Sequence, residues 1–232
     1  MAYNANVDIP FTLSSLCYAL GYLTGLAAFV IMAYRRRLAT SGFMAIMGAG
    51  LIGGLVGANL AQWIFGSEGG KTILGGIAGG YLTVLVYKRY LGIQRSTGDL
   101  FAVAICAGEA VGRWGCFFGG CCYGKICSVP WAVLQHGALR HPTQLYLSGA
   151  NALILLILLR LESKQPPENA IFYTQGILYC AARFVIEFFR DTPPPFWGLT
   201  LAQWACLGGF AFFSVRLTLL LRPLAKMGAV YG

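Results

Sequence analysis

Charged side chains are scarce in this sequence. Only 11% of the 232 residues are Asp, Glu, Lys or Arg, and the acidic residues number 8, whereas about 25% of an ordinary soluble domain is charged. So few charges cannot coat a soluble globule of this size, which argues against a soluble enzyme. The 57% share of apolar residues also excludes a disordered chain, because disorder requires low hydrophobicity.

Proline and cysteine are also too sparse for two other classes of protein. With 9 prolines and 8 cysteines in 232 residues, the chain is neither a collagen-like fibre nor a small disulfide scaffold. The mean hydropathy is +0.66 and the chain has 31 glycines, which fits a protein in lipid better than one in water. The net charge of +9 would suit a nucleic-acid partner, but the basic residues stand in short clusters between apolar runs, as topology signals do. The sequence therefore predicts a membrane protein that binds no nucleic acid.

The apolar runs predict an all-α integral membrane protein whose residues 1–232 form a single domain. A hydrocarbon core of about 30 Å requires about 20 apolar residues per helix. Seven runs meet this length approximately, at 11–33, 41–65, 71–88, 97–119, 144–160, 170–189 and 198–221. The first run is expected to be an anchor helix and not a cleaved signal peptide, because no cation precedes it and Arg35, Arg36 and Arg37 follow it.

The distribution of Lys and Arg predicts the orientation. With the N-terminus outside, ten cations fall on the inner side and four on the outer side, which is the bias expected of cytoplasmic loops. The inner ones are Arg35, Arg36, Arg37, Lys88, Arg89, Arg95, Arg160, Lys164, Arg222 and Lys226, and the outer ones are Lys71, Lys125, Arg140 and Arg190. We therefore expect the C-terminus in the cytoplasm and the loop 120–143 on the outer face.

Glycines recur at four-residue intervals in the second and third runs. Residues 48–53 match the dinucleotide fingerprint, but that motif must follow a strand and open a helix, and here it lies inside an apolar run. Small residues at this spacing let two membrane helices approach closely, so we expect packing. The alternative is that the glycine-rich stretch before Ile77, which includes Gly75 and Gly76, is a broken helix lining a cavity.

Four ionisable side chains lie inside predicted spans as two pairs, Glu109 with Arg113 and Arg183 with Glu187. Each pair is spaced i,i+4 and so shares one helix face. The pairs are either structural or functional. A buried ion pair rarely stabilises a helix bundle more than two apolar residues would, and charged residues inside a membrane usually have a function. We therefore favour a functional polar cavity. Guanidinium is a planar fork of donors that suits phosphate, which predicts an anionic phospholipid ligand.

Arg190 and Arg216 lie near span ends, from which a long side chain can reach water. We assign neither of them a role.

The eight cysteines fall into two groups. Four are scattered within spans and are expected to be apolar core residues, namely Cys17, Cys106, Cys180 and Cys206. The others, Cys116, Cys121, Cys122 and Cys127, follow a C-x4-C-C-x4-C pattern. This differs from two Cys-x-x-Cys knuckles, so no metal is expected. A disulfide on an oxidising face and a reactive thiolate with its pKa lowered by Arg113 and Lys125 both remain open.

Three segments resemble the prolipoprotein diacylglyceryl transferase family. They are Gly112-Arg113-Trp114-Gly115-Cys116-Phe117-Phe118-Gly119-Gly120-Cys121-Cys122-Tyr123-Gly124, then His141-Pro142-Thr143-Gln144-Leu145-Tyr146, then Arg183-Phe184-Val185-Ile186-Glu187-Phe188-Phe189-Arg190. The resemblance implies a bacterial inner-membrane enzyme, without cofactors, that moves the diacylglyceryl group of phosphatidylglycerol onto the lipobox cysteine of a preprolipoprotein at the outer face.

The resemblance also implies roles for individual residues. Arg113 is similar to the family arginine that holds the lipid phosphate, and the remaining catalytic candidates are Arg183, Glu187, His141, Cys121 and Cys116. The substrate-binding candidates are Tyr18, Gln144, Tyr146, Gly75 and Gly76, together with Glu109, which is an addition to the family pattern and is a candidate because of its ion pair.

The sequence departs from the family pattern at several positions. Leu74 stands where the family has a histidine, Cys116 and Gly119 stand at asparagine positions, and Cys121 stands at a glutamate position. The base that deprotonates the acceptor thiol is therefore left open between Glu187, Glu109, His141 and a cysteine. Two alternative functions follow on the same fold: a thiol-redox or small-solute membrane protein that uses Cys121 and Cys122, or a lipid-binding paralogue without activity.

Overall fold

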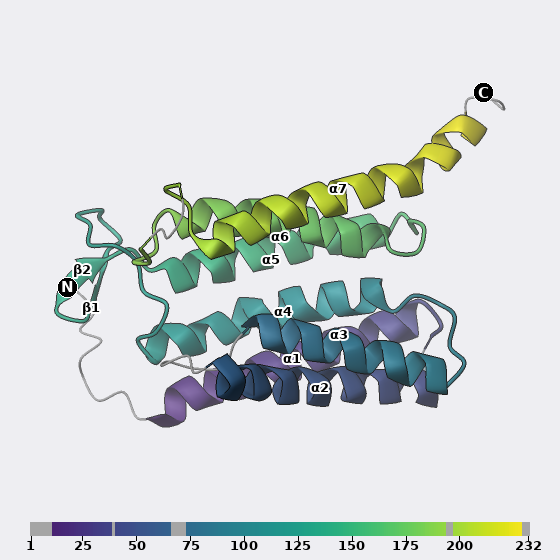
Figure 1. Cartoon of the computed structure of the whole chain (residues 1–232), viewed down its shortest axis with the longest axis horizontal. Coiled ribbons are helices and arrows are strands. Elements are labelled where there is room, and N and C mark those ends of the chain that lie inside the picture. The colour runs from purple at the N-terminus through teal and green to yellow at the C-terminus, as the bar shows by residue number, and fades with distance from the viewer. Residues whose placement is uncertain (1–10, 39, 66–72, 194–196, 229–232) are drawn as a thin grey trace. The chain divides into compact units, whose positions relative to one another are not determined.

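The computed structural model describes residues 11–38, 40–65, 73–193 and 197–228. Its helices are α1 (Phe11–Arg35), α2 (Ser41–Phe65), α3 (Ile73–Tyr90), α4 (Gly98–Phe118), α5 (Thr143–Glu162), α6 (Ala170–Glu187) and α7 (Leu201–Gly228). Each of the seven apolar runs thus overlaps one helix, and Figure 1 shows the order of the helices along the chain. The prediction of an all-helical architecture with seven helices is confirmed.

Five helices in the described ranges are long and apolar enough to cross a membrane. They are α1, α2, α4, α5 and α7. The other two are 18 residues long, and both carry charge: α3 ends in Lys88 and Arg89, and α6 contains Arg183 and Glu187. The membrane character of the chain is therefore supported, whereas seven crossings and the orientation of the termini stay predictions.

A short β-hairpin stands in the loop between α4 and α5, where the sequence predicts no strand. Strand β1 (Val133–Gln135) pairs with the antiparallel strand β2 (Ala138–Arg140). The turn between them, His136-Gly137, has positive φ at both residues, which matches the right-handed twist of a two-residue hairpin. A backbone bridge joins Gly124 to Arg190, so the loop is tied to the end of α6.

The described residues group into two compact units. The first comprises the described residues up to 28 and from 97 onwards, and the second comprises those between 29 and 96. In the first unit, α4 packs against α5 and α6, and α6 packs against α7. The buried Asp99 carboxylate accepts hydrogen bonds from the backbone N–H groups of Asn169 and Phe172, at 3.0 and 2.9 Å. It thereby satisfies free donors at the start of α6 and links the beginnings of α4 and α6.

In the second unit, α2 and α3 meet at their glycines. A Cβ atom added at Gly79 would lie 2.8 Å from the Gly57 Cα, and one added at Gly80 would lie 3.1 Å from the Gly50 carbonyl oxygen. Such distances leave no room for a side chain, so the backbones themselves are in contact. The packing role predicted for the glycine spacing is confirmed for this helix pair.

Gly57→Leu is expected to destabilise the α2–α3 pair by about 1–3 kcal/mol, the usual cost of overpacking. The matched control is Gly48→Leu in the same helix, because a Cβ atom at Gly48 meets nothing within 4 Å. The measurement is the free energy of unfolding in mixed micelles. Equal stabilities of the two variants would contradict the close backbone contact.

Candidate active site

The cysteine-rich segment begins where α4 ends. The backbone N–H of Cys121 donates to the Cys116 carbonyl oxygen at 3.1 Å, and the N–H of Gly120 donates to that of Phe117 at 3.2 Å. Gly120 has φ +66°. This pair of bonds with a left-handed glycine is the Schellman ending of a helix, and it folds Cys121 back over Cys116.

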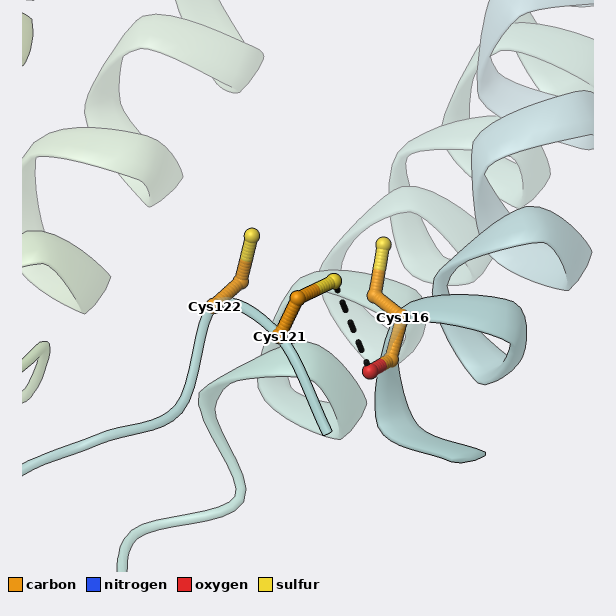
Figure 2. Close-up of side chains that lie close together, drawn as sticks. All are labelled: Cys116, Cys121 and Cys122. Carbon is orange, nitrogen blue, oxygen red and sulfur yellow. Dashed lines mark hydrogen bonds between the residues drawn. The ribbon is translucent and has the colours of Figure 1, made fainter. Parts of the chain in front are cut away.

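Three cysteine sulfurs converge as a result. The Sγ atoms of Cys116, Cys121 and Cys122 all lie within 4.8 Å of one another (Figure 2). All eight cysteines of the chain are free thiols in this structure. The Tyr18 hydroxyl of α1 lies 3.4 Å from the Cys116 sulfur and 3.8 Å from the Cys121 sulfur, which brings this substrate-binding candidate to the cysteines.

The first residues of α5 hold the backbone of Cys121 and Cys122 in place. The Thr143 hydroxyl donates to the Cys122 carbonyl oxygen, and the Gln144 Nε2 donates to that of Cys121, both at 2.7 Å. Gln144 is only 1% exposed, and it also donates to Gln135 of the hairpin at 3.3 Å. Its visible role is therefore to position the cysteine loop, while contact with substrate stays a prediction.

The charge around Cys122 differs from the sequence expectation in one respect. The pKa of the Cys122 thiol is lowered because it interacts with the thiols of Cys116 and Cys121 and with the positive charges of Arg190 and Arg113. The contribution of Arg113 was expected from the sequence, and that of Arg190 was not. The pKa of Cys121 is raised, chiefly by hydrogen bonds to Cys116 and Cys122.

The first ion pair lies on α4 and is held by α5. Arg113 Nη2 is 2.9 Å from Glu109 Oε1, and Asn151 Nδ2 donates to the other carboxylate oxygen at 3.1 Å. The Ser148 hydroxyl of α5 donates to the Ala110 carbonyl oxygen, next to Glu109. The predicted pairing of Glu109 with Arg113 is confirmed, and Asn151 is a partner that the sequence analysis did not identify.

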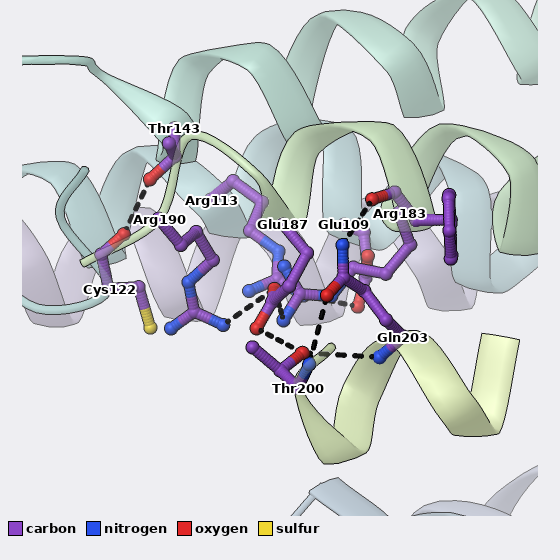
Figure 3. A network of polar contacts seen from close by, with 10 residues as sticks. Glu109, Arg113, Cys122, Thr143, Arg183, Glu187, Arg190, Thr200 and Gln203 are labelled. Atoms are coloured by element: carbon purple, nitrogen blue, oxygen red, sulfur yellow. Dashed lines mark hydrogen bonds and ion pairs between the residues drawn. The ribbon is translucent and has the colours of Figure 1, made fainter. Parts of the chain in front are cut away.

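The second ion pair lies at the end of α6 and involves more groups (Figure 3). Arg183 Nη2 is 2.8 Å from Glu187 Oε2, and Arg190 Nη1 is 3.5 Å from the same oxygen. The Thr200 hydroxyl donates to Glu187 Oε1 at 3.2 Å. Glu187 is only 4% exposed, so this buried carboxylate holds two arginines. Arg190, which received no role from its sequence position, belongs to the site.

Thr200 is held in place by the start of α7. The Gln203 backbone N–H donates to the Thr200 hydroxyl at 3.2 Å, and the Thr200 backbone N–H donates to Gln203 Oε1 at 2.9 Å. This reciprocal arrangement is a capping box. Its signature, Thr-x-x-Gln before an apolar run, is present in the sequence and could have predicted this cap.

The arginines of the two ion pairs are close enough for their positive charges to interact. The charge of Arg183 interacts with those of Arg190 and Arg113, so three guanidiniums and two carboxylates share the site. Among the described residues, Arg183 Nη1 and Arg190 Nε are buried nitrogens with no hydrogen-bond partner. Buried donors of this kind are costly unless paired, and they are suited to receive the oxygens of an anion.

His141 lies in an aromatic cluster beside the site. Its Nδ1 is 3.1 Å from the Tyr146 hydroxyl, which accepts a hydrogen bond from Trp131 Nε1 at 2.7 Å. Its ring also contacts that of Phe189, with the centroids 5.1 Å apart. The two candidates His141 and Tyr146 are therefore brought together, and their catalytic and binding roles stay predictions.

Gly75 and Gly76 lie in the other unit, on α3. A Cβ atom at Gly76 would lie 3.4 Å from the Gly54 carbonyl oxygen of α2, which is ordinary van der Waals contact, so Gly76 faces α2 without the clash that a side chain at Gly79 would meet. Substrate binding by the two glycines stays a prediction.

Buried arginines and carboxylates beside clustered thiols define a membrane protein with a buried polar site. Comparison with known sequences identifies the family. A family model described as prolipoprotein diacylglyceryl transferase matches residues 5–219. This chain belongs to that family of membrane transferases.

Two relatives illustrate the extent of the similarity. The phosphatidylglycerol–prolipoprotein diacylglyceryl transferase of Bordetella avium is 35% identical over 161 residues, which cover 63% of this chain and 61% of the relative. The protein of the same name from Bordetella parapertussis is 31% identical over 244 residues, covering 86% and 90%. The chain thus spans less than two thirds of the length of the first relative and most of the second.

Proposed function

We propose that this chain transfers the diacylglyceryl group of phosphatidylglycerol, or of another anionic phospholipid, to the cysteine thiol of a lipobox-bearing preprolipoprotein. The observation that carries the proposal is the group of three arginines whose buried donors, Arg183 Nη1 and Arg190 Nε, have no partner among the described residues. A phospholipid phosphate is the anion available at this depth in a membrane. The names of the family and of its relatives support the same substrates.

The reaction is a displacement at carbon C3 of the diacylglyceryl group. The acceptor sulfur forms a bond to C3, the C3–O bond breaks, and its electrons leave with the oxygen of glycerol phosphate. Such a step requires a deprotonated thiol and groups that stabilise the departing phosphate. Arg113, Arg183 and Arg190 serve the second requirement, because guanidinium binds phosphate oxygens as a bidentate fork.

The two carboxylates hold the arginines in position. Glu187 accepts from Arg183, Arg190 and Thr200, and Glu109 accepts from Arg113 and Asn151. Both oxygens of each carboxylate are thereby engaged by these partners. Glu109 and Glu187 are therefore assigned as positioning residues, and the acceptor thiol needs another source of activation.

The reaction is placed at the outer face of the bacterial inner membrane. The support is the bias of ten cations against four in the sequence and the rule that cytoplasmic loops carry more Lys and Arg. An outer site also suits an acceptor that is exported before it is modified.

A reporter fused after residue 232 is expected to be active only in the cytoplasm, and one inserted in the loop 124–140 only outside. The physical reason is the Lys and Arg bias of the intervening loops. The measurement uses a phosphatase that is active outside paired with a fluorescent protein that folds inside. The opposite pattern would overturn the outer-face site.

The proposed activity is tested with radiolabelled phosphatidylglycerol and a lipobox peptide in proteoliposomes, by following the release of glycerol phosphate. The control is the same peptide with serine in place of its cysteine. Release that depends on the cysteine is expected. Bound phospholipid without release would contradict transfer and indicate a lipid-binding paralogue.

A thiol-redox protein is a second candidate, and the three converging sulfurs favour it. In that case Cys121 and Cys122 would close to a disulfide while passing two electrons and two protons to a disulfide partner. Activity would then depend on Cys121 and persist in Arg113→Ala, whereas the transferase loses activity in Arg113→Ala.

A further inference from the structure

The three-cysteine cluster has the ligand atoms of a metal site. The sulfurs of Cys116, Cys121 and Cys122 lie within 4.8 Å of one another, and Figure 2 shows the three side chains directed to the same side of the loop. Cys116 and Cys122 are half-buried and Cys121 is exposed. The cluster is therefore built into the protein on one side and open on the other.

Backbone hydrogen bonds preorganise the three cysteines. The Schellman ending of α4 returns Cys121 to Cys116, and Thr143 and Gln144 fix the carbonyl groups of Cys122 and Cys121. Cys122 has φ +59°, a left-handed conformation that is unfavourable for a non-glycine residue and is concentrated at functional sites. Linear spacing does not reveal this arrangement, which is why no metal is expected from the sequence.

The geometry fits a small thiophilic cation. Zn²⁺ binds thiolate sulfur at about 2.3 Å, so three sulfurs around it stand about 3.7–4.0 Å apart. Closing the cluster from its present spread needs side-chain shifts of about 1 Å, as that difference requires. Three thiolates and one divalent cation carry a net charge of −1, and Arg113 and Arg190 provide positive charge beside Cys122.

We propose that Cys116, Cys121 and Cys122 bind one thiophilic divalent cation of the Zn²⁺ class and leave its fourth position open. Sites with three protein ligands and one open position are the catalytic type of zinc site. The open position would take the sulfur of the acceptor cysteine, and this part of the proposal rests on the proposed function.

Metal coordination supplies the activation that the acceptor thiol needs. A coordinating thiol is deprotonated outright, so R–SH becomes a metal-bound thiolate and its proton passes to water. The sulfur electron pair then forms the bond to C3, and the electrons of the C3–O bond leave on glycerol phosphate, which takes up a proton. No oxidant or reductant is consumed.

The metal site is tested on the full chain in detergent after reduction and removal of metals. Titration with Cd²⁺ is followed by the ultraviolet charge-transfer band of cadmium thiolates. We expect saturation at one Cd²⁺ per chain, competition by Zn²⁺, and a loss of affinity of at least about tenfold in Cys121→Ser and Cys122→Ser. Cys127→Ser is the matched control, because Cys127 lies in the same loop outside the cluster, and it should bind like the parent protein.

Two results would overturn the metal site. One is the absence of a saturable band in the reduced, folded protein. The other is a band that is unchanged in Cys121→Ser and Cys122→Ser, with folding of both variants verified by size-exclusion chromatography.

The open position is tested with Co²⁺ in place of Cd²⁺. The visible spectrum should shift when a lipobox peptide is added and stay unchanged with its serine counterpart, because only the thiol can coordinate. An unchanged spectrum with both peptides would overturn acceptor binding by the metal. Stoichiometric Cd²⁺ binding without any diacylglyceryl transfer would instead contradict the proposed function and support the metal site by itself.

Discussion

Arg183→Lys is expected to fold and to lose activity by about 100-fold or more, the effect of removing one well-placed donor to a developing negative charge. Lysine keeps the positive charge opposite Glu187, which is 2.8 Å from Arg183 in the parent protein. It cannot reproduce the planar fork that contacts a carboxylate and a phosphate together. The measurement is release of glycerol phosphate in proteoliposomes, normalised to folded protein.

Arg216→Lys is the matched control for this substitution. Arg216 is also an arginine on a membrane helix, and its guanidinium contacts the Tyr173 hydroxyl at 3.1 and 3.3 Å. Because this contact involves no member of the arginine group described above, activity should stay near that of the parent protein. Full activity in Arg183→Lys would reduce Arg183 to a structural role.

The helices could be predicted because each is encoded locally. An apolar run of sufficient length forms a helix wherever the chain is in lipid, and α4 and α5 begin within two residues of the predicted spans. The hairpin could not be predicted in this way. Its strands have three residues each, too few to establish an alternating pattern, and only the turn His136-Gly137 carries a local signal.

The ion pairs were predictable for a similar reason. Residues four apart on a helix share a face, so the sequence alone pairs Glu109 with Arg113 and Arg183 with Glu187. Contacts from other elements have no such local signature. Asn151 comes from α5, and Arg190 follows the last turn of α6, so their places in the site depend on how the helices pack.

The cysteine cluster could be predicted only in part from the sequence. Gly119-Gly120 directly after a helix is the usual signal of a Schellman ending, and that ending brings together residues five apart such as Cys116 and Cys121. This rule predicts from the sequence that two of the three sulfurs meet. The position of Cys122 also depends on Thr143 in α5, which no local rule provides.

Arg113→Met is expected to abolish transfer and to destabilise the protein by about 3 kcal/mol, because it leaves a carboxylate without its cation inside the protein. The Glu109 side chain is 26% exposed, so the cost falls at the lower end of the range for buried pairs. Asn151 would remain its one side-chain partner among the described residues. Stability is measured as the free energy of unfolding in mixed micelles.

The double variant Arg113→Met with Glu109→Leu separates stability from catalysis. Replacing both members of a buried pair by apolar residues is often neutral or stabilising, so the free energy of unfolding should return to within about 1 kcal/mol of the parent value, as that rule implies. Asn151 keeps one of its two amide N–H hydrogen bonds, to the Leu147 carbonyl oxygen at 3.0 Å. Transfer should still be absent, because no guanidinium at position 113 can bind the departing phosphate. Recovery of transfer together with stability would show that Arg113 only neutralises Glu109, and the anion site would then have to be built from Arg183 and Arg190 alone.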